Sequence, residues 1–256
     1  MKGVACIFYW ILRRRYRVHI EGIERLKKSG AKLLLPNHPA HIDPQILTAL
    51  VRLHCDFVPV VSEQFANLPF IGYFIRRQNA VVVSDLKFGN RDPNVLNTIV
   101  SGVLNAFENN KSVIIYPAGG IKHTSHEVIK NKQSVHAIVG QLPEHVTILG
   151  VRIHGLWGSM WSVAWNGKRP NFLWCMTKGI FYFFLNLVFF LPKRNVRIEF
   201  VDITTEVQGI AHMDRQNFNS KLEEFYNVAG PEKVCYLKHG FFFPKLRKMY
   251  PENLTG

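Results

Sequence analysis

The stretch 31-AKLLLPNHPAHIDPQ-45 changes character twice over a short length of chain. It opens with an apolar run, continues as a polar segment that holds three prolines and two histidines, and then enters helical sequence over about 44–53. This pattern predicts a buried strand over 31–36, a stiff loop and the start of a helix. Because ligands in open α/β sheets bind beyond the carboxyl ends of the strands, we expect this loop to carry function.

The rest of the chain continues the alternation of strand and helix. Asp92 and Pro93 are a typical cap and first residue for a helix over 93–108, and Asp214 is a typical cap for a helix over 214–227. Short Val- and Ile-rich runs predict further strands that are buried on both faces. The alternation indicates the α/β class, with a mostly parallel central sheet flanked by helices. These strands are predicted at 57–61, 80–84, 112–117, 146–153 and 196–203.

The composition bounds the range of partners. The 256 residues include 32 Lys and Arg against 18 Asp and Glu, a formal net charge of +14. This excess favours an anionic partner, which is either nucleic acid, an acidic membrane surface or a polyanionic cosubstrate. A hydrophobic content of 47% predicts a globular chain, and the length suits one large domain. The four cysteines are far apart without a CxxC pair, which indicates reduced thiols rather than a zinc ribbon or redox motif.

Three segments join apolar or aromatic residues to basic ones. Residues 3–12 are apolar and lead into an arginine cluster, but the run is shorter than the roughly 20 residues that span a bilayer. It is either a membrane-interface helix over 1–15 or an ordinary first helix packed on the domain. The run 172–192 could span a membrane, lie in its interface or form a core helix. Residues 239–248 again combine phenylalanines with basic side chains.

These segments together favour a membrane surface over nucleic acid. Contiguous phenylalanines suit lipid better than they suit bases, which stack on spaced aromatic platforms. We therefore expect a peripheral or monotopic membrane protein on the cytoplasmic face, bound to an anionic membrane surface and with no nucleic-acid partner.

The polar loop holds groups for acid–base chemistry. The Asp43-Pro44 pair repeats the start signal of Asp92-Pro93, so Asp43 is predicted to cap the helix and also to lie near His38. The amino-terminal end of a helix disfavours a nearby imidazolium and so tends to keep the histidine neutral. A neutral histidine that a carboxylate orients is suited to act as a general base.

A metal site is the alternative reading of the same loop. His38, His41 and Asp43 follow an H-x-x-H-x-D spacing, which misses the H-x-H-x-D-H pattern of binuclear metallohydrolases. The other histidines form no second cluster with recognisable ligand spacing. We therefore predict no metal ligand here, and we assign His41 no role.

The residues of this loop and of four later segments resemble those of a known family. His38 and Asp43, within NHPAHID, resemble the H-x4-D motif of the PlsC-like glycerolipid and lysophospholipid acyltransferases. Further blocks of that family are matched in order and spacing over about 15–205. They are 69-PFIG-72, 79-NAVVV-83, 113-VIIYPAGG-120 and 148-ILGVRIHG-155.

The resemblance implies a membrane-associated O-acyltransferase that needs no cofactor. In such enzymes the histidine takes the proton of a lysophospholipid hydroxyl, which then attacks the thioester of acyl-CoA or acyl carrier protein. Carried over to this chain, His38 is the base and Asp43 orients it. The resemblance also implies one acyltransferase domain over 1–256, with a catalytic core over about 15–205 and a C-terminal helix and basic-aromatic tail over 206–256.

The chain departs from the family where that family binds phosphate. The second-motif arginine falls on Asp85, with Lys87 the nearest cation, and Ala118 replaces the glutamate of the third block. A missing arginine weakens the case for a phosphomonoester acceptor, 1-acylglycerol-3-phosphate, and favours a lysophosphodiester, as in the 2-acylglycerophosphoethanolamine acyltransferase branch. Residues that could contact the acceptor phosphate instead are Gly119, Gly120, Lys122, Lys87 and Arg152.

Two other functions stay open at this point. The altered blocks suit a non-catalytic lipid-binding relative, although such a module gains nothing from a base. A metal-dependent hydrolase is the second alternative, and bound metal or sensitivity to a chelator would distinguish it.

Overall fold

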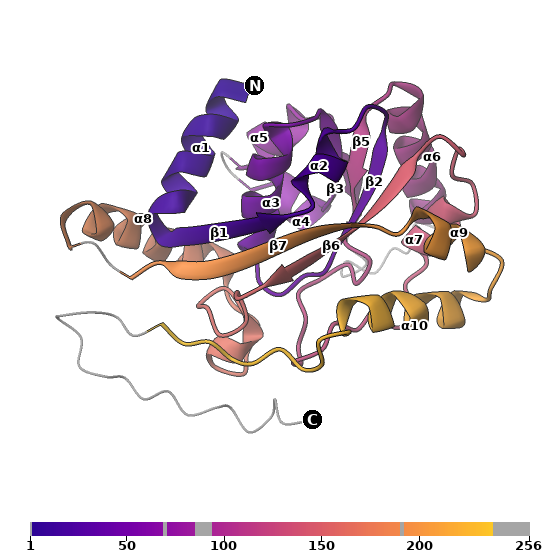
Figure 1. Cartoon of the computed structure of the whole chain (residues 1–256). Helices are drawn as coiled ribbons and strands as arrows, with labels where there is room; N and C mark the ends of the chain where they lie inside the picture. Colours follow the sequence, from indigo (N-terminus) through magenta and orange to yellow (C-terminus); the bar gives the residue numbers. More distant parts are fainter. Residues whose placement is uncertain (1, 69–70, 85–93, 190–191, 238–256) are drawn as a thin grey trace.

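One mixed sheet organises the protein. The computed structural model describes residues 2–68, 71–84, 94–189 and 192–237. Within them a seven-stranded sheet has the order β1-β7-β6-β2-β5-β3-β4 (Figure 1). Five neighbouring strands run parallel, β7 is antiparallel to β6, and β1 is parallel to β7. The strands are β1 Tyr16–Glu21, β2 Lys32–Pro36, β3 Phe57–Ser62, β4 Val81–Val83, β5 Ser112–Ile114, β6 Thr147–His154 and β7 Arg194–Asp202.

The predicted strands and the mostly parallel sheet are confirmed, and β1 is an addition. Helices cover both faces because side chains alternate along each strand. Leu34 joins the hydrophobic cluster beneath α1, α2, α3 and α8, whereas Leu33 and Leu35 join the cluster beneath α6, α7, α9 and α10. The helices are α1 Lys2–Arg15, α2 Ile23–Lys27, α3 Asp43–Arg52, α4 Glu63–Ala66, α5 Ile71–Arg76, α6 Val95–Glu108, α7 Ser134–Val139, α8 Phe172–Phe189, α9 Thr204–Gly209 and α10 Arg215–Tyr226.

The helix starts agree only in part with the predicted caps. Asp214 is confirmed, because its carboxylate accepts the N–H groups of Gln216 and Asn217. Asp92 and Pro93 lie outside the described residues. The prediction that Asp43 caps its helix is wrong. Asp43 is the first residue of α3, and its carboxylate turns back into the preceding loop instead of accepting a helix N–H.

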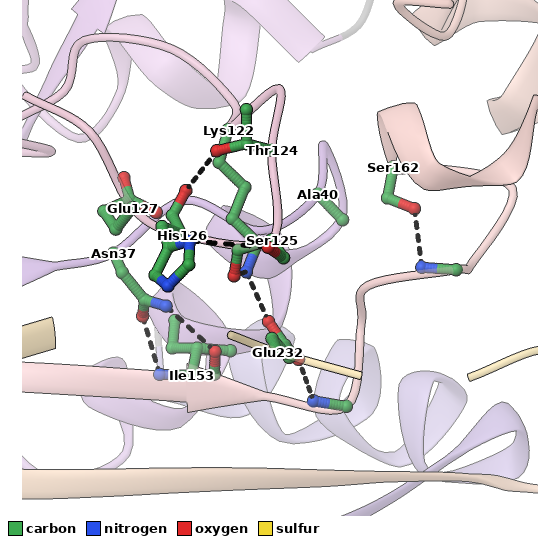
Figure 2. A network of polar contacts seen from close by, with 12 residues as sticks. Asn37, Ala40, Lys122, Thr124, Ser125, His126, Glu127, Ile153, Ser162 and Glu232 are labelled. Carbon is green, nitrogen blue, oxygen red and sulfur yellow. Dashed lines mark hydrogen bonds and ion pairs between the residues drawn. The ribbon is translucent and has the colours of Figure 1, made fainter. Parts of the chain in front are cut away.

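The fold places the polar loop at the carboxyl ends of the parallel strands. The parallel strands β2, β5 and β6 end here. Asn37, directly after β2, accepts the N–H of Ile153 (2.7 Å) and donates to its carbonyl oxygen (3.0 Å), as Figure 2 shows. These two bonds fix the first residue of the loop to β6, so His38 leaves the sheet in a defined direction.

The N-terminal helix and the second apolar run lie together. α1 packs against α8 at one end of the sheet (Figure 1). Both helices leave large apolar side chains exposed, among them Ile7, Trp10, Trp174 and Phe184. Among the described helices, none is both long and apolar enough to cross a membrane. The predicted basic-aromatic patch at 239–248 lies outside the described residues.

Candidate active site

His38 and Asp43 form a hydrogen-bonded pair. His38 Nδ1 lies 3.0 Å from Asp43 Oδ2, and the same oxygen accepts the N–H of Ala40 at 2.9 Å. The Asp43 side chain is fully buried, while 13% of the His38 side chain is exposed. A carboxylate on Nδ1 favours the tautomer that carries its proton there, so Nε2 is left free to accept one.

The backbone of His38 is held from both sides. Its N–H donates to Glu127 Oε2 at 3.2 Å, and its carbonyl oxygen accepts the N–H of Lys122 at 2.8 Å. Both partners come from the segment after β5, which folds against the loop. The side chain of Glu127 is buried, and Asn227 pairs with its backbone N–H (2.8 Å) and carbonyl oxygen (2.9 Å). Residues that are distant in the sequence therefore fix the backbone of His38 through hydrogen bonds.

Tyr116, at the end of the strand β5 segment, packs on the histidine ring. The ring centroids of Tyr116 and His38 are 4.4 Å apart, at an interplanar angle of 36°. Burial, followed by the negative charge of Asp43, raises the pKa of Tyr116 well above its usual value. The Tyr116 hydroxyl and Asp43 Oδ1 are both buried, and neither has a hydrogen-bond partner among the described residues.

Two further titratable groups border His38. Burial raises the pKa of Glu127 to about 7, against the lowering effects of the hydrogen bond from His38 and the charges of His38 and Lys122. Burial, then the proximity of His38 and Arg169, lowers the pKa of His41 to about 4. His41 is therefore neutral at physiological pH, and its ring makes edge contacts with Phe65 and Phe172.

A large apolar cavity borders His38. It has a volume of about 1780 Å³, and His38 and Tyr116 line it. Phe8 of α1, together with Phe172 and Met176 of α8, forms part of its apolar wall. The arrangement can remove a proton from a hydroxyl group at His38 Nε2 while an apolar chain occupies the cavity.

Lys122 does not face this cavity. Its ammonium group pairs with Glu232 at 2.6 Å, hydrogen-bonds the Ser125 carbonyl oxygen and lies 4.8 Å from the centre of the Trp157 ring. Figure 2 shows Lys122 and Glu232 pointing toward one another. Its side chain is 3% exposed. The geometry therefore gives no support to Lys122 as a phosphate ligand, although its backbone N–H holds the His38 loop.

The other predicted acceptor-binding residues are scattered. Arg152 pairs with Glu199 at 3.4 Å and lies over Phe225, away from the cavity lining. Gly119 lines the cavity with φ +65°, but its N–H already donates to the Tyr116 carbonyl oxygen in a turn. Gly120 is outside the lining. Lys87 lies outside the described residues.

A cation that sequence reasoning missed stands at the cavity edge. Lys132 lines the cavity, and a Cβ placed on Gly119 would lie 3.8 Å from its Nζ. Among the described residues it makes no ion pair, in contrast to Lys122 and Arg152. No periodicity marks Lys132, since it sits in the irregular segment before α7.

In the part of the chain that the structure describes, no three His, Cys, Asp or Glu side chains come together as a metal site would require. The His41 ring makes edge contacts with Phe65 and Phe172 and lies 6.4 Å, centre to centre, from the His38 ring.

Comparison with known proteins settles the family. A family model described as Acyltransferase matches residues 17–154, more than half of the chain, and this span includes the His38 loop and the strands around it. The chain belongs to the acyltransferase family. A comparison with curated proteins found no significant match.

The PlsC-like fold is also matched in three dimensions. The chain resembles the crystal structure of the 1-acyl-sn-glycerophosphate (LPA) acyltransferase PlsC from Thermotoga maritima, with a TM-score of 0.53 and 16% sequence identity. The match covers 88% of this chain and 78% of that one. This likeness establishes a shared fold, so the chain is an acyltransferase with a PlsC-like fold.

Proposed function

We propose that this acyltransferase is a membrane-associated enzyme that transfers a fatty acyl group from acyl-CoA or acyl carrier protein to the free hydroxyl of a lysophospholipid. The observation that carries the proposal is the His38–Asp43 pair, with a carboxylate on Nδ1 of a histidine that lines a large apolar cavity. We also infer a single catalytic domain, because the two main hydrophobic clusters lie on the two faces of one sheet.

His38 can carry the hydroxyl proton through both steps of the reaction. His38 Nε2 takes the proton of the acceptor hydroxyl while its oxygen attacks the thioester carbonyl carbon. Asp43 stabilises the imidazolium that forms. The tetrahedral intermediate then collapses, the carbon–sulfur bond breaks, and the departing thiolate takes the proton from His38. The products are an ester and a free thiol, and the histidine returns to its starting state.

Lys132 is our candidate for the phosphate of the acceptor. It is the cavity-lining cation nearest to Gly119, and the glycine allows close approach because it has no side chain. A single ammonium is a point charge rather than a bidentate fork. This suits the monoanionic phosphodiester of a lysophosphodiester better than a phosphomonoester dianion, in keeping with the altered motifs of the sequence.

The exposed faces of α1 and α8 support membrane association. Trp10 and Trp174 are about half exposed, and each carries a cation over its ring, Arg14 at 4.4 Å and Lys178 at 3.5 Å from the ring centre. Aromatic rings beside basic side chains suit the interface between acyl chains and anionic headgroups. The same two helices form part of the cavity wall, so an acyl chain could pass from the bilayer into the cavity.

The test is acyl transfer from labelled acyl-CoA and acyl carrier protein to a panel of lysophospholipids on anionic vesicles, with and without a chelator. We expect transfer that a chelator does not abolish. Lys132→Met should raise the KM for the acceptor about tenfold, whereas Lys27→Met, an exposed lysine on α2 outside the cavity lining, should leave it unchanged.

Two other outcomes would support the alternatives. A folded protein that binds vesicles but transfers nothing to any acceptor would be a non-catalytic lipid-binding relative. Hydrolysis that a chelator abolishes would instead point to a metal-dependent hydrolase.

A further inference from the structure

Three buried oxygen atoms behind the His38–Asp43 pair have no hydrogen-bond partner among the described residues. They are Asp43 Oδ1, the Tyr116 hydroxyl and Glu127 Oε1. They come from the start of α3 and from the stretch between β5 and α7. After burial, the charge of Asp43 raises the pKa of Tyr116, and the same charge opposes ionisation of Glu127. Buried polar groups are almost always hydrogen-bonded in folded proteins, so three unpaired oxygens around His38 need an explanation, and a functional role is one.

Tyr116 is the natural donor within this group. It keeps its proton at neutral pH because burial and Asp43 raise its pKa well above the usual value. Asp43 is also the charged group that acts most strongly on this phenol, so the hydroxyl is the donor available to Asp43 Oδ1. Asp43 would then be fixed through both oxygens, since Oδ2 already contacts His38 and the N–H of Ala40.

Glu127 occupies the backbone side of the histidine. Oε2 accepts the His38 N–H, and Asn227 fixes the Glu127 backbone, so the carboxyl group is held in place. The titratable or charged groups around it are His38, Asp43, Tyr116 from the end of the β5 segment, Lys122 from its own segment and Tyr226 from α10. When it is ionised, Glu127 adds a negative charge beside His38 that Asp43 alone does not supply.

We propose that Tyr116 and Glu127 are positioning residues for acyl transfer, in which Tyr116 fixes Asp43 and ionised Glu127 stabilises His38 after it has taken the hydroxyl proton. This inference rests on the proposed function for its kinetic consequences. The arrangement of buried groups that it invokes can be tested without any catalysis.

The kinetic test of Glu127 uses Glu127→Gln, which keeps an oxygen for the His38 N–H but removes the charge. We expect kcat at pH 8 to fall roughly tenfold with KM unchanged, and the pH profile to lose the ionisation near pH 7 that belongs to Glu127. Glu223→Gln is the matched control, because Glu223 accepts N–H groups of Ile129 and Lys130 nearby but does not contact His38. A Glu127→Gln enzyme with the wild-type pH profile would overturn the role of Glu127.

The kinetic test of Tyr116 uses Tyr116→Phe, which removes only the hydroxyl. We expect kcat to fall several-fold at constant KM, and no further fall when the same change is made in an Asp43→Asn enzyme, because Tyr116 acts through Asp43. Tyr236→Phe removes a hydroxyl that instead donates to the Ala164 carbonyl oxygen, and it should leave kcat unchanged. Equal losses in the presence and absence of Asp43 would overturn the role of Tyr116.

An infrared titration tests the arrangement independently of activity. A buried protonated carboxyl group has an isolated C=O stretching band. We expect such a band to disappear with a midpoint near pH 7 in the wild type and in Glu223→Gln, and to be absent in Glu127→Gln. If the band behaves in this way in a protein that transfers no acyl group, the proposed function fails while the buried arrangement stands. If Glu127→Gln leaves the band unchanged, the arrangement itself is wrong.

Discussion

The carboxylate of Asp43 points backward along the chain, to 3.0 Å from His38 Nδ1, although Asp43 is the first residue of α3. The same oxygen accepts the Ala40 N–H, and the Asp43 N–H donates to the Ala40 carbonyl oxygen at 3.2 Å. The pair is therefore a product of one tight local turn. A carboxylate in the first turn of a helix also interacts favourably with the helix dipole.

Replacing this carboxylate tests its part in the reaction. Asp43→Asn keeps the size of the side chain but removes the charge that stabilises an imidazolium. We expect kcat to fall by about 100-fold or more while KM for both substrates changes little. The measurement is steady-state acyl transfer at saturating donor. An Asp43→Asn enzyme with wild-type kcat would show that His38 does not depend on this partner.

Glu127 should make stability depend on pH. Its pKa is raised to about 7 in the folded protein, so the unfolded chain loses its proton first as pH rises, and the folded state loses relative stability between about pH 4.5 and pH 7. Glu127→Gln removes this penalty. Relative to wild type, we expect the variant to gain on the order of 2–3 kcal/mol more at pH 8 than at pH 5.

Urea unfolding of both proteins at pH 5 and pH 8 measures this difference. Glu223→Gln, whose carboxylate lies in the same region, controls for a general effect of removing a charge. A gain that is the same at the two pH values would mean that Glu127 does not hold its proton to an elevated pH.

His41 should affect stability more than catalysis. Burial, followed by the proximity of His38 and Arg169, lowers the pKa of His41 to about 4. It therefore stays neutral where the enzyme works, and its ring packs against Phe65 and Phe172. As pH falls from about 6.5 toward 4, the unfolded chain takes up a proton that the folded protein refuses, so stability is lost on the acid side. We expect His41→Phe to reduce this acid-side loss and to keep kcat within about threefold of wild type. Thermal unfolding at pH 5 and pH 7 measures the change in stability, and an acyl-transfer assay measures kcat. A loss of kcat as large as that of His38→Ala would contradict this view of His41.

The Lys122–Glu232 ion pair should be structural. Both side chains are almost buried, at 3% and 11% exposure, and removing one partner leaves an uncompensated charge. We expect Lys122→Met to destabilise the protein by roughly 3–5 kcal/mol, with part of the loss recovered in Lys122→Met/Glu232→Gln. Urea unfolding gives the stability, and the KM for the acceptor should stay unchanged. A raised KM without loss of stability would return Lys122 to the phosphate-binding role that its sequence position suggests.

The fold was largely predictable because its central strands are continuous apolar runs that alternate with amphipathic helices. The predicted helix that becomes α6, for example, carries its apolar residues on one face at four-residue steps. The edge strand β1, 16-YRVHIE-21, was not predicted, although its apolar and polar residues alternate as in a half-buried strand. It follows directly on the arginine cluster that ends the first helix, and this cluster obscured the pattern. It forms a strand because β7 pairs with it along its whole length.

The candidate site was predictable only where it is local in sequence. His38 and Asp43 lie in one turn, so their spacing in the sequence is enough to predict that their side chains meet. Glu127 reaches His38 across 89 positions and has no distinguishing pattern around it. Lys122 sits where the motif register places a phosphate contact, but the register does not tell which way a side chain turns. The Lys122 side chain turns inward and pairs with the largely buried Glu232.

The most direct test of the central claim is acyl transfer by wild type, His38→Ala and His123→Ala, measured on the same vesicles with the same acyl thioester. His123 is an exposed histidine of the neighbouring loop and serves as the matched control. We expect wild type and His123→Ala to transfer equally well, and His38→Ala to lose about 100-fold or more in kcat. Undiminished transfer by a folded His38→Ala protein would contradict the assignment of His38 as the base.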